Sequence, residues 1–525
     1  MNIIEKHMVE MPDGVKLFTI VQRPPDTGRA PVIFQRGPYE NKEIDEEPLR
    51  NADLRGYCII TQHCRGTALS EGDFIPYDDE RRDGLATLEW IRRQPFYGGE
   101  IYLQGVSYTS AVHLSYLSAR PADVRGGWLN VMETERYNIV YRNGVLKTGL
   151  HGSWSVDMYK RNSILRKNFV AETFLTHPLA GITPYIFGEE ARCIEELFLH
   201  ESKDDPFWQT PPGGSEYRDA MVDLPFPLLL TGAFYDIFME GMFDMWETMP
   251  AEIRQRSAFI VSPYDHDING GESPLKFKDA SLQKLYPEFN LDWYDHLRTG
   301  APLKFIQPGK TTYYPCFGSE WRTRDFLTDG DKAWTLYLND GTLDTSPGPG
   351  GTRHYVYNPA APARFLGGLC HTFGGMKEQD PPNSRYDILS FMGAPVEARH
   401  LFEGRGSVRL RVRSDRPDTG FYVRLSVVKG GKTWPLRSDI TSLGRQHPGY
   451  QPGEEVWLDF ELAPHAYWLE PGDRLRLDVS SSCFPHFLPH TNRCGIQALQ
   501  TGADIARNTI VLGCSSMTLH ENTQG

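Results

Sequence analysis

The chain has little positive charge, no long apolar run and no regular pattern of cysteines. Lysine and arginine total 55 against 68 aspartate and glutamate residues, and the resulting net charge of −13 disfavours nucleic acid or an anionic membrane as a partner. No stretch approaches the roughly 18 apolar residues that a membrane-spanning helix requires. The first ten residues are partly charged and hold no apolar signal segment, so we expect a cytoplasmic protein.

The eight cysteines are scattered, and no C-x-x-C pair occurs among them. In a long chain without a secretory signal they are expected to be mostly reduced thiols. His63 and Cys64 are adjacent, but no second pair follows at the spacing of a zinc site. We therefore expect neither a metal ion nor another cofactor.

What the chain does contain is enough apolar sequence for several domains, since 40% of its 525 residues are hydrophobic. Short apolar runs at residues 31–35, 57–61 and 101–104 are each ended by glycine or proline, which is typical of strands buried on both faces. Residues 78–94, between the second and third runs, have the pattern of an amphipathic helix. This alternation predicts an α/β core with a parallel sheet.

Two changes of pattern divide the rest of the chain. From about residue 131 the spacing of apolar residues is helical, with no strand-like run, and buried strands resume after residue 222. After about residue 330 apolar and polar residues alternate with period two, which predicts an antiparallel β-sandwich. We expect an α/β core in two parts, 1–130 and 223–325, a helical insertion at 131–222 and a β domain at 326–525.

The clearest chemical signal is the segment Gly105-Val106-Ser107-Tyr108, which directly follows a predicted strand and precedes a helical stretch. Strand, tight turn and helix form the setting of a nucleophile elbow, which exposes a serine hydroxyl at the end of the sheet. A G-x-S triplet also occurs in ordinary turns. The setting favours Ser107 as a catalytic nucleophile.

A serine hydroxyl needs a histidine to take its proton and a carboxylate to orient that histidine. Asp236 follows the predicted strand at 226–232, and His266 follows the one at 258–261. Each alone is compatible with an ordinary loop residue. Their chain order after Ser107 and their positions at strand ends predict the Ser–Asp–His triad of an α/β hydrolase.

The negative charge of a tetrahedral intermediate requires hydrogen-bond donors. The backbone N–H of Tyr108, directly after the nucleophile, is one candidate. The hydroxyl of Tyr39, in the loop after the first predicted strand, is a second, although a buried aromatic side chain would explain this residue equally well. Four further aromatic residues are candidates for the substrate pocket, with core packing as the alternative: Tyr137, Trp154, Trp208 and Phe234.

These motifs resemble the serine hydrolases that include cocaine esterase, α-amino-acid ester hydrolases, certain cephalosporin acylases and X-prolyl dipeptidyl-peptidases. Arg36-Gly37-Pro38-Tyr39 resembles the R-x-P-Y of that family, and Gly105-Val106-Ser107-Tyr108 resembles its G-x-S-Y. The resemblance covers nearly the whole chain. It implies an α/β-hydrolase core with a helical cap and a C-terminal jelly-roll domain, and Tyr39 as an oxyanion donor. It leaves a homodimer or larger homo-oligomer open.

The chain departs from the family pattern at three places. His63-Cys64 stands where the family has D-x, Ser110 stands where it has glycine, and His486 stands where it has arginine. The first and third departures remove charged groups, so salt bridges of relatives cannot be assumed there. The residues of the predicted triad match the family.

The predicted function is a serine hydrolase that cleaves an ester or activated amide of a small acyl substrate through an acyl-enzyme. Asp236 is followed by the apolar Ile237, Phe238 and Met239. Because a buried ammonium needs a partner, we expect no strong selectivity for a free α-amino group. An acyltransferase or biosynthetic ester- or amide-forming enzyme with the same triad is one alternative. A catalytically idle binding protein is another, and the intact triad argues against it.

Overall fold

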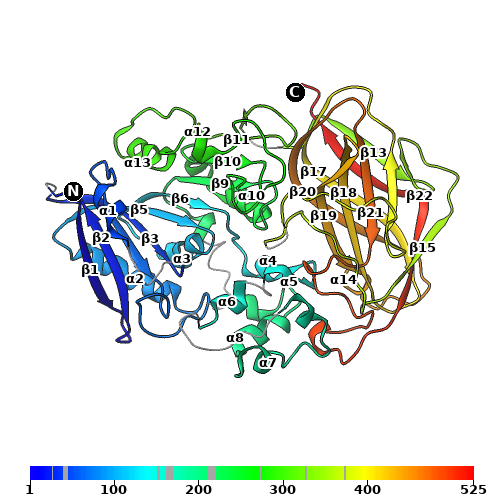
Figure 1. The fold of residues 1–525 in the computed structure, drawn as a ribbon, viewed down its shortest axis with the longest axis horizontal. Helices are drawn as coiled ribbons and strands as arrows, with labels where there is room; N and C mark the ends of the chain where they lie inside the picture. Colours follow the sequence, from blue (N-terminus) through cyan, green and yellow to red (C-terminus); the bar gives the residue numbers. More distant parts are fainter. Residues whose placement is uncertain are drawn as a thin grey trace.

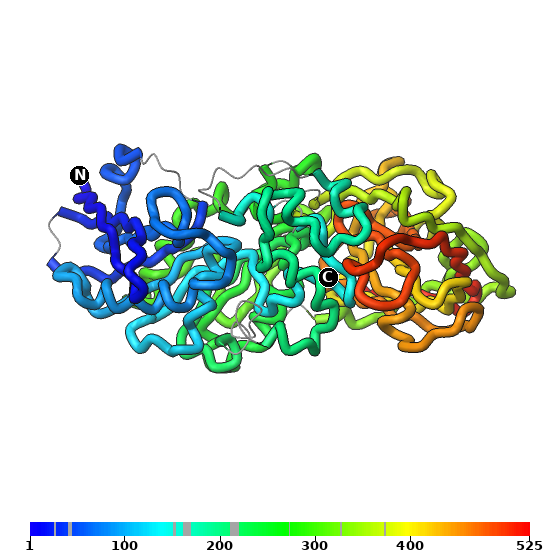
Figure 2. The backbone as a smooth tube through the Cα atoms, turned by 90° about the horizontal axis from the view of Figure 1, so that it is seen from below, coloured from blue at the N-terminus to red at the C-terminus, as the bar shows by residue number. Residues whose placement is uncertain are grey.

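The computed structural model describes residues 1–525 except 26–27, 40–44, 151–153, 161–169, 210–219, 272, 326–327, 372–373 and 525. An α/β core and a β domain lie at opposite ends, and a set of short helices lies between them along one side (Figure 1). Seen from below, the molecule is elongated, with the N-terminal core at one end (Figure 2). The predicted α/β-hydrolase core with a C-terminal all-β domain is confirmed.

The core is built on a ten-stranded sheet with the order β1-β2-β4-β3-β5-β6-β9-β10-β11-β12. Neighbouring strands from β4 to β11 are parallel, whereas β1, β2 and β12 are antiparallel to their neighbours. The antiparallel pair β1–β2 extends the sheet beyond the predicted strands. The strands are β1 Ile3–Glu10, β2 Lys16–Arg23, β3 Ala30–Gly37, β4 Cys58–His63, β5 Tyr97–Val106, β6 Val124–Asn130, β9 Leu228–Ala233, β10 Ala258–Ser262, β11 Thr311–Tyr313 and β12 Arg322–Arg324.

Helices cover both faces of this sheet, as the apolar strand sequences require. In β3, Val32 and Phe34 belong to the apolar cluster that includes residues of α2 and α3. Ile33, between them, points to the opposite face and belongs to a cluster with Trp293 and Tyr294 of α13. The helices of the core are α1 Glu46–Asn51, α2 Glu80–Arg92, α3 Tyr108–Leu117, α10 Met239–Thr248, α11 Ala251–Arg254, α12 Leu282–Leu285 and α13 Phe289–Thr299.

The segment between β6 and β9 forms the cap. It consists mainly of short helices and turns with an apolar cluster of its own, which also includes Ile237, Phe238, Phe484 and Leu488 from outside the cap. The cap therefore packs on both the core and the β domain. It also contains a hairpin that the helical pattern did not predict. The described elements are α4 Arg136–Val140, β7 Tyr141–Arg142, β8 Val145–Leu146, α5 Thr148–Leu150, α6 Val156–Met158, α7 Thr183–Phe187 and α8 Arg192–Glu195.

The β domain contains a second ten-stranded sheet, with the order β19-β18-β21-β16-β14-β13-β22-β17-β20 and with β15 paired to β22. All of its pairings are antiparallel except that of β14 with β16. Its strands are β13 Lys332–Leu338, β14 Thr342–Asp344, β15 Thr352–Tyr357, β16 Leu389–Gly393, β17 His400–Ser414, β18 Gly420–Lys429, β19 Lys432–Ser442, β20 Val456–Leu469, β21 Arg474–Ser480 and β22 Ala506–Glu521.

The β domain is hydrogen-bonded to the core. The backbone N–H of Cys316, after β11, donates to Ala466 at 2.8 Å, and that of Trp468 donates to Cys316 at 2.9 Å. The hydroxyl of Tyr235, in the loop after β9, donates to the backbone oxygen of Pro435 at 2.7 Å. These contacts fix the β domain against the edge of the core where β9 and β11 end.

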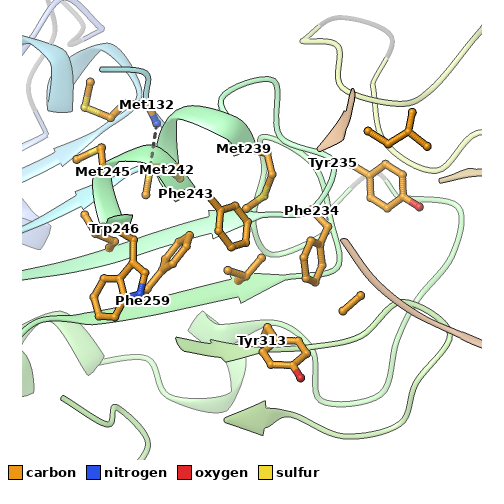
Figure 3. Packing of buried hydrophobic residues seen from close by; sticks show 14 of the residues in the cluster. Met132, Phe234, Tyr235, Met239, Met242, Phe243, Met245, Trp246, Phe259 and Tyr313 are labelled. Carbon is orange, nitrogen blue, oxygen red and sulfur yellow. Dashed lines mark hydrogen bonds between the residues drawn. The ribbon is translucent and has the colours of Figure 1, made fainter. Parts of the chain in front are cut away.

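Helix α10 is packed firmly against the sheet just after the loop that carries Asp236. Phe243 and Trp246 of α10 contact Phe259 of β10, with ring centroids 5.2 and 6.0 Å apart (Figure 3). Met242 packs in the same cluster, and the backbone N–H of Met132 donates to its sulfur at 3.4 Å. A close-packed interior resists displacement, so the loop between β9 and α10 has a rigid support. No described helix combines the length and the apolar character needed to cross a membrane.

Candidate active site

Ser107 lies in a strained turn between β5 and α3. Its backbone angles are φ 57° and ψ −127°, a region that a residue with a side chain seldom adopts. The turn is so tight that a Cβ atom on Gly105 would lie 2.6 Å from the backbone nitrogen of Ser110. Glycine is therefore required at position 105, and the serine side chain is held at the carboxyl end of the sheet.

The structure brings Ser107, His266 and Asp236 together in one hydrogen-bonded chain. His266 Nε2 is 3.0 Å from the Ser107 hydroxyl, and His266 Nδ1 is 2.5 Å from Asp236 Oδ2. The other carboxylate oxygen of Asp236 accepts the backbone N–H of Phe238 at 2.6 Å. Asp236 is completely buried, so its orientation is fixed from both sides. This geometry is that of a nucleophile, a general base and an orienting acid.

Neighbouring carboxylates control the charge of His266. Burial opposes its protonation, but Asp236, Asp265 and Asp267 together hold the pKa of His266 above its ordinary value of 6.5. Asp236 makes the largest of these favourable contributions through charge and hydrogen bonding. The imidazolium that forms when Ser107 loses its proton is therefore stabilised.

The pH dependence of hydrolysis should report this raised pKa. Only neutral His266 accepts a proton, so kcat/KM is expected to fall as the pH drops through an inflection above 6.5. Asp265→Asn removes one of the supporting charges and should move the inflection to lower pH. Asp340→Asn makes the same charge change at an exposed turn of the β domain and should not move it. If the inflection is unchanged in Asp265→Asn, the assignment of the acidic limb of the pH profile to His266 is contradicted.

Tyr39, after β3, is placed to donate to an oxyanion. The indole N–H of Trp154 donates to the Tyr39 hydroxyl oxygen at 3.0 Å, so the hydroxyl proton must point elsewhere. Burial raises the pKa of Tyr39 to about 12, and Ser107 is among its hydrogen-bonding neighbours. The hydroxyl thus stays protonated beside the nucleophile, where the oxygen of a bound acyl group would lie.

The second predicted donor, the backbone N–H of Tyr108, begins helix α3. The Tyr108 side chain anchors this position, because its hydroxyl donates to Glu80 at 2.8 Å and accepts the backbone N–H of Tyr77 at 2.7 Å. Glu80 is buried and forms an ion pair with the buried Arg36. A chain of partners from Arg36 to Tyr108 therefore holds the start of α3 in place.

Removing the Tyr39 hydroxyl should affect the chemical step. Tyr39→Phe is expected to lower kcat about 10²- to 10³-fold with little change in KM, because an oxyanion donor acts mainly in the transition state. Trp154→Phe removes the indole N–H that bonds this hydroxyl but keeps the hydroxyl itself, so it should have a smaller effect on kcat. Steady-state hydrolysis of p-nitrophenyl acetate measures both. A kcat of Tyr39→Phe within twofold of wild type would rule out the oxyanion role.

A pocket with an empty volume of about 510 Å³ opens beside Ser107. The core, the cap and the β domain all contribute to it, and most of its side chains are apolar or aromatic. Such a lining suits the acyl part of a small substrate. The lining residues are Tyr77, Ser107, Tyr108, Ala111, Met132, Glu133, Arg136, Ile139, Leu150, Trp154, Ser155, Phe238 and His371.

Of the four aromatic residues predicted for this pocket, Trp154 lines it, and the structure places the other three elsewhere. Tyr137 and Trp208 pack against each other in the cap, with ring centroids 5.5 Å apart. Phe234 is completely buried near Tyr313 and His465 (Figure 3). These three rings fill apolar interiors, which was the alternative explanation of their sequence pattern.

The pocket contains a carboxyl group that sequence reasoning missed. Glu133 follows β6 and accepts the backbone N–H groups of Thr134 and Glu135 at 2.9 and 3.2 Å. Burial raises the pKa of Glu133 above its usual range, while burial lowers the pKa of neighbouring Lys147. The available signal was position, because Glu133 follows a parallel strand at the same edge of the sheet as Asp236 does.

The pocket also contains a cation that was not predicted. The guanidinium of Arg136 lies over the ring of Tyr77, 3.5 Å from its centroid. Arg136 and Glu133 are both buried. One side of the acyl pocket is therefore polar, although no charged motif in the sequence marked it.

Comparison with known proteins assigns the chain to a family. The model described as X-Pro dipeptidyl-peptidase (S15 family) matches residues 13–267, which include all three residues of the hydrogen-bonded chain. A model for the C-terminal non-catalytic domain of X-Pro dipeptidyl-peptidase matches residues 304–515. The protein belongs to the S15 family. It is a serine hydrolase, as predicted.

This S15 protein is similar in sequence to an esterase and similar in fold to a peptidase and to an ester hydrolase. Cocaine esterase from Rhodococcus sp. strain MB1 Bresler is 27% identical, over 98% of this chain and 96% of the esterase. An aminopeptidase from the marine sediment archaeon Thaumarchaeota archaeon and an α-amino-acid ester hydrolase have similar structures. Each has a TM-score of 0.82 and is 18% identical in sequence. Each match covers 99% of this chain and 97% of the other chain. At this identity the two structures show the shared fold.

The structure explains the three departures from the S15 family pattern. Ser110 is buried, and its hydroxyl donates to the backbone oxygen of Asn130 at 3.1 Å and accepts its N–H at 3.0 Å. His63 is buried against Phe18, and burial lowers its pKa to about 4. Burial also lowers the pKa of His486. His63 and His486 are thus neutral imidazoles at two positions where the family pattern has charged residues. The Ser110 hydroxyl is hydrogen-bonded to β6.

Proposed function

We propose that the protein hydrolyses small esters or activated amides through an acyl-enzyme on Ser107. The observation that carries this proposal is the hydrogen-bonded chain Ser107–His266–Asp236 beside a largely apolar pocket. Ser107 Oγ bonds to the carbonyl carbon while His266 Nε2 takes its proton, and His266 returns the proton to the leaving oxygen or nitrogen. A water molecule then attacks the acyl carbon while His266 Nε2 takes a proton from it, and His266 passes that proton to Ser107 Oγ as the free acid leaves.

The oxyanion formed in both steps would be stabilised by the Tyr39 hydroxyl and the Tyr108 N–H. Tyr39 is supported by Trp154, and Tyr108 is supported by Glu80. Because both donors are held in place before the substrate binds, little reorganisation is needed when the charge develops. This arrangement favours acyl transfer chemistry over simple binding of a carbonyl compound.

We further propose that the enzyme does not select strongly for a free α-amino group. The carboxyl groups near the pocket already have cationic neighbours, since Glu240 accepts from Arg142 at 2.7 Å and Glu133 lies near Lys147. Burial also favours the neutral form of Glu133. A substrate ammonium would have to compete with Lys147 for this carboxyl and would lose its hydration on entry.

A matched pair of substrates tests this selectivity. We expect methyl phenylglycinate and methyl phenylacetate to have kcat/KM values within about tenfold of each other, once their alkaline hydrolysis rates are taken into account. A close ammonium–carboxylate contact would give a larger preference, on the order of 100-fold or more. Such a preference, lost in Glu133→Gln, would contradict the proposal. Labelling of Ser107 by a fluorophosphonate tests the acyl-enzyme step separately.

Acyl transfer to an amine or alcohol is a second candidate, and one feature favours it. A polar cavity with an empty volume of about 1010 Å³ lies on the other side of Glu133, and it is lined by Lys147, Arg142 and Glu240 among others. A polar acceptor would find hydrogen-bond partners there. Product analysis distinguishes the two activities, because a transferase forms a new ester or amide when the acceptor is supplied and a hydrolase forms only the free acid.

A further inference from the structure

Among the residues that the structure describes, the β domain contributes one polar side chain to the acyl pocket, that of His371. This residue lies in the long connection between β15 and β16 and lines the pocket together with Ser107 and Phe238. Its ring is 5.1 Å from the ring of His266, centroid to centroid, in an edge-to-face arrangement. The β domain therefore reaches the catalytic centre itself.

The segment that carries His371 is tied down at its base. Gly368 and Gly375 form an isolated antiparallel bridge, with N–H···O distances of 2.8 and 3.0 Å. The buried guanidinium of Arg424 donates to the backbone oxygens of Leu366 at 2.6 Å and Gly367 at 3.2 Å. The bridge joins the two ends of the segment, and Arg424 fixes the first end to β18, so the position of His371 depends on the docking of the β domain.

The segment also fits closely against the loop that carries His266. A Cβ atom on Gly375 would lie 2.6 Å from a carboxylate oxygen of Asp265, the residue before His266. Cys370, on the other side of His371, is buried and packs against Gly149 of the cap. The residues on either side of His371 thus contact the core and the cap.

His371 does not serve the triad directly. Both ring nitrogens of His266 are already engaged, one by Asp236 and the other by Ser107. Burial lowers the pKa of His371 to about 4, so its ring is neutral near pH 7 and offers one donor and one acceptor. Its Nδ1 atom is buried and has no hydrogen-bond partner among the residues that the structure describes. An unsatisfied buried nitrogen is costly, and a polar atom of a substrate would relieve that cost.

We propose that His371 is a specificity-determining residue that hydrogen-bonds a polar atom on the acyl part of the substrate. The preferred substrates are then esters whose acyl chain carries a hydroxyl, ether or amide group near the scissile carbonyl, in preference to hydrocarbon chains of the same shape. This inference rests on the proposed acyl-enzyme function, because it assigns the pocket beside Ser107 to the acyl group.

A pair of isosteric substrates tests the proposal. The p-nitrophenyl esters of 3-hydroxybutanoate and 3-methylbutanoate differ by a hydroxyl in place of a methyl group. The kcat/KM value of the 3-hydroxybutanoate ester is divided by that of the 3-methylbutanoate ester, and this ratio is compared between wild type and His371→Phe. We expect the ratio to fall about fivefold to tenfold in the variant, because the ring is kept and the hydrogen bond is lost. His371→Asn keeps a donor and an acceptor and should restore part of the ratio.

Several outcomes would overturn the proposal. The proposal is wrong if the ratio in His371→Phe equals that of wild type. An unchanged ratio with unchanged activity would mean that His371 does not contact the acyl group, and an unchanged ratio with an equal loss on both esters would indicate a structural role. Stoichiometric fluorophosphonate labelling and an unchanged Tm show that the variant is folded and that Ser107 still reacts. A wild-type protein that neither takes up the label nor hydrolyses either ester would refute the proposed function itself, and this result is distinct from an unchanged ratio.

Discussion

Replacing Ser107 with alanine is expected to lower kcat/KM for p-nitrophenyl esters by about 10⁴- to 10⁶-fold. The reason is that Ser107 is the hydroxyl hydrogen-bonded to His266 Nε2, and no other described side chain stands in that relation to His266. The variant should also lose its reaction with a fluorophosphonate. The residual rate would come from the oxyanion donors and the pocket, which the substitution leaves in place.

Ser118→Ala is the matched control for this experiment. Ser118 is an exposed serine at the end of the same helix, and its hydroxyl accepts from Arg81 at 2.6 Å. Activity and labelling of this variant should equal those of wild type. The Tm of Ser107→Ala should be at least that of wild type, because the backbone at residue 107 is strained with either side chain. Full labelling of Ser107→Ala would show that the nucleophile is a different residue.

Asp236→Asn is expected to lower kcat by about 10⁴-fold. Asp236 Oδ1 accepts the backbone N–H of Phe238, and an asparagine oxygen can take over that role. The asparagine NH₂ would then face His266 Nδ1 and donate to it. His266 would carry its proton on Nε2 and could no longer accept the proton of Ser107.

The geometry distinguishes this effect from a loss of charge alone. Asp265→Asn removes a carboxylate that raises the pKa of His266 without bonding its ring, and it should cost less than tenfold in kcat. Burst kinetics and the Tm of both variants separate a slower acylation from a loss of folded protein. If Asp265→Asn and Asp236→Asn lose activity equally, the tautomer argument is wrong and the charge of the loop is what matters.

The order of the reacting residues was accessible from the sequence because each follows a short buried strand. Ser107, Asp236 and His266 come directly after β5, β9 and β10, and these strands are parallel members of one sheet. The carboxyl ends of parallel strands lie at one edge, so residues at those ends are brought together whatever the loops between them do. The elbow at Ser107 follows from local sterics in the same way.

Other parts of the fold have weaker local signals. Strands β1 and β2 extend the sheet beyond the predicted first strand, and their antiparallel pairing is a contact between neighbouring chain segments. The residues of β1 are only partly apolar, because β1 is an edge strand that is largely exposed on one face. The periodicity and composition of the sequence therefore predicted strands that are buried on both faces and did not predict the edge strand β1.

The lining of the pocket was the least predictable feature. Tyr137, Trp208 and Phe234 have the same composition signal as Trp154, yet only Trp154 lies beside Ser107. An aromatic side chain gains the same burial in a core as in a pocket, so its type does not say which one it occupies. Glu133 likewise gave no signal except its position after a strand.

By itself, the sequence determined the fold class and identified the residues that we propose carry out the chemistry, because strand ends and tight turns are encoded over a few neighbouring positions. The tertiary structure decided which side chains a substrate meets. Tyr108 comes from the core, Trp154 from the cap and His371 from the β domain, and 263 positions separate the first and last of these (371 − 108). Their convergence depends on how three separately packed parts dock, and no local pattern in the chain encodes that docking.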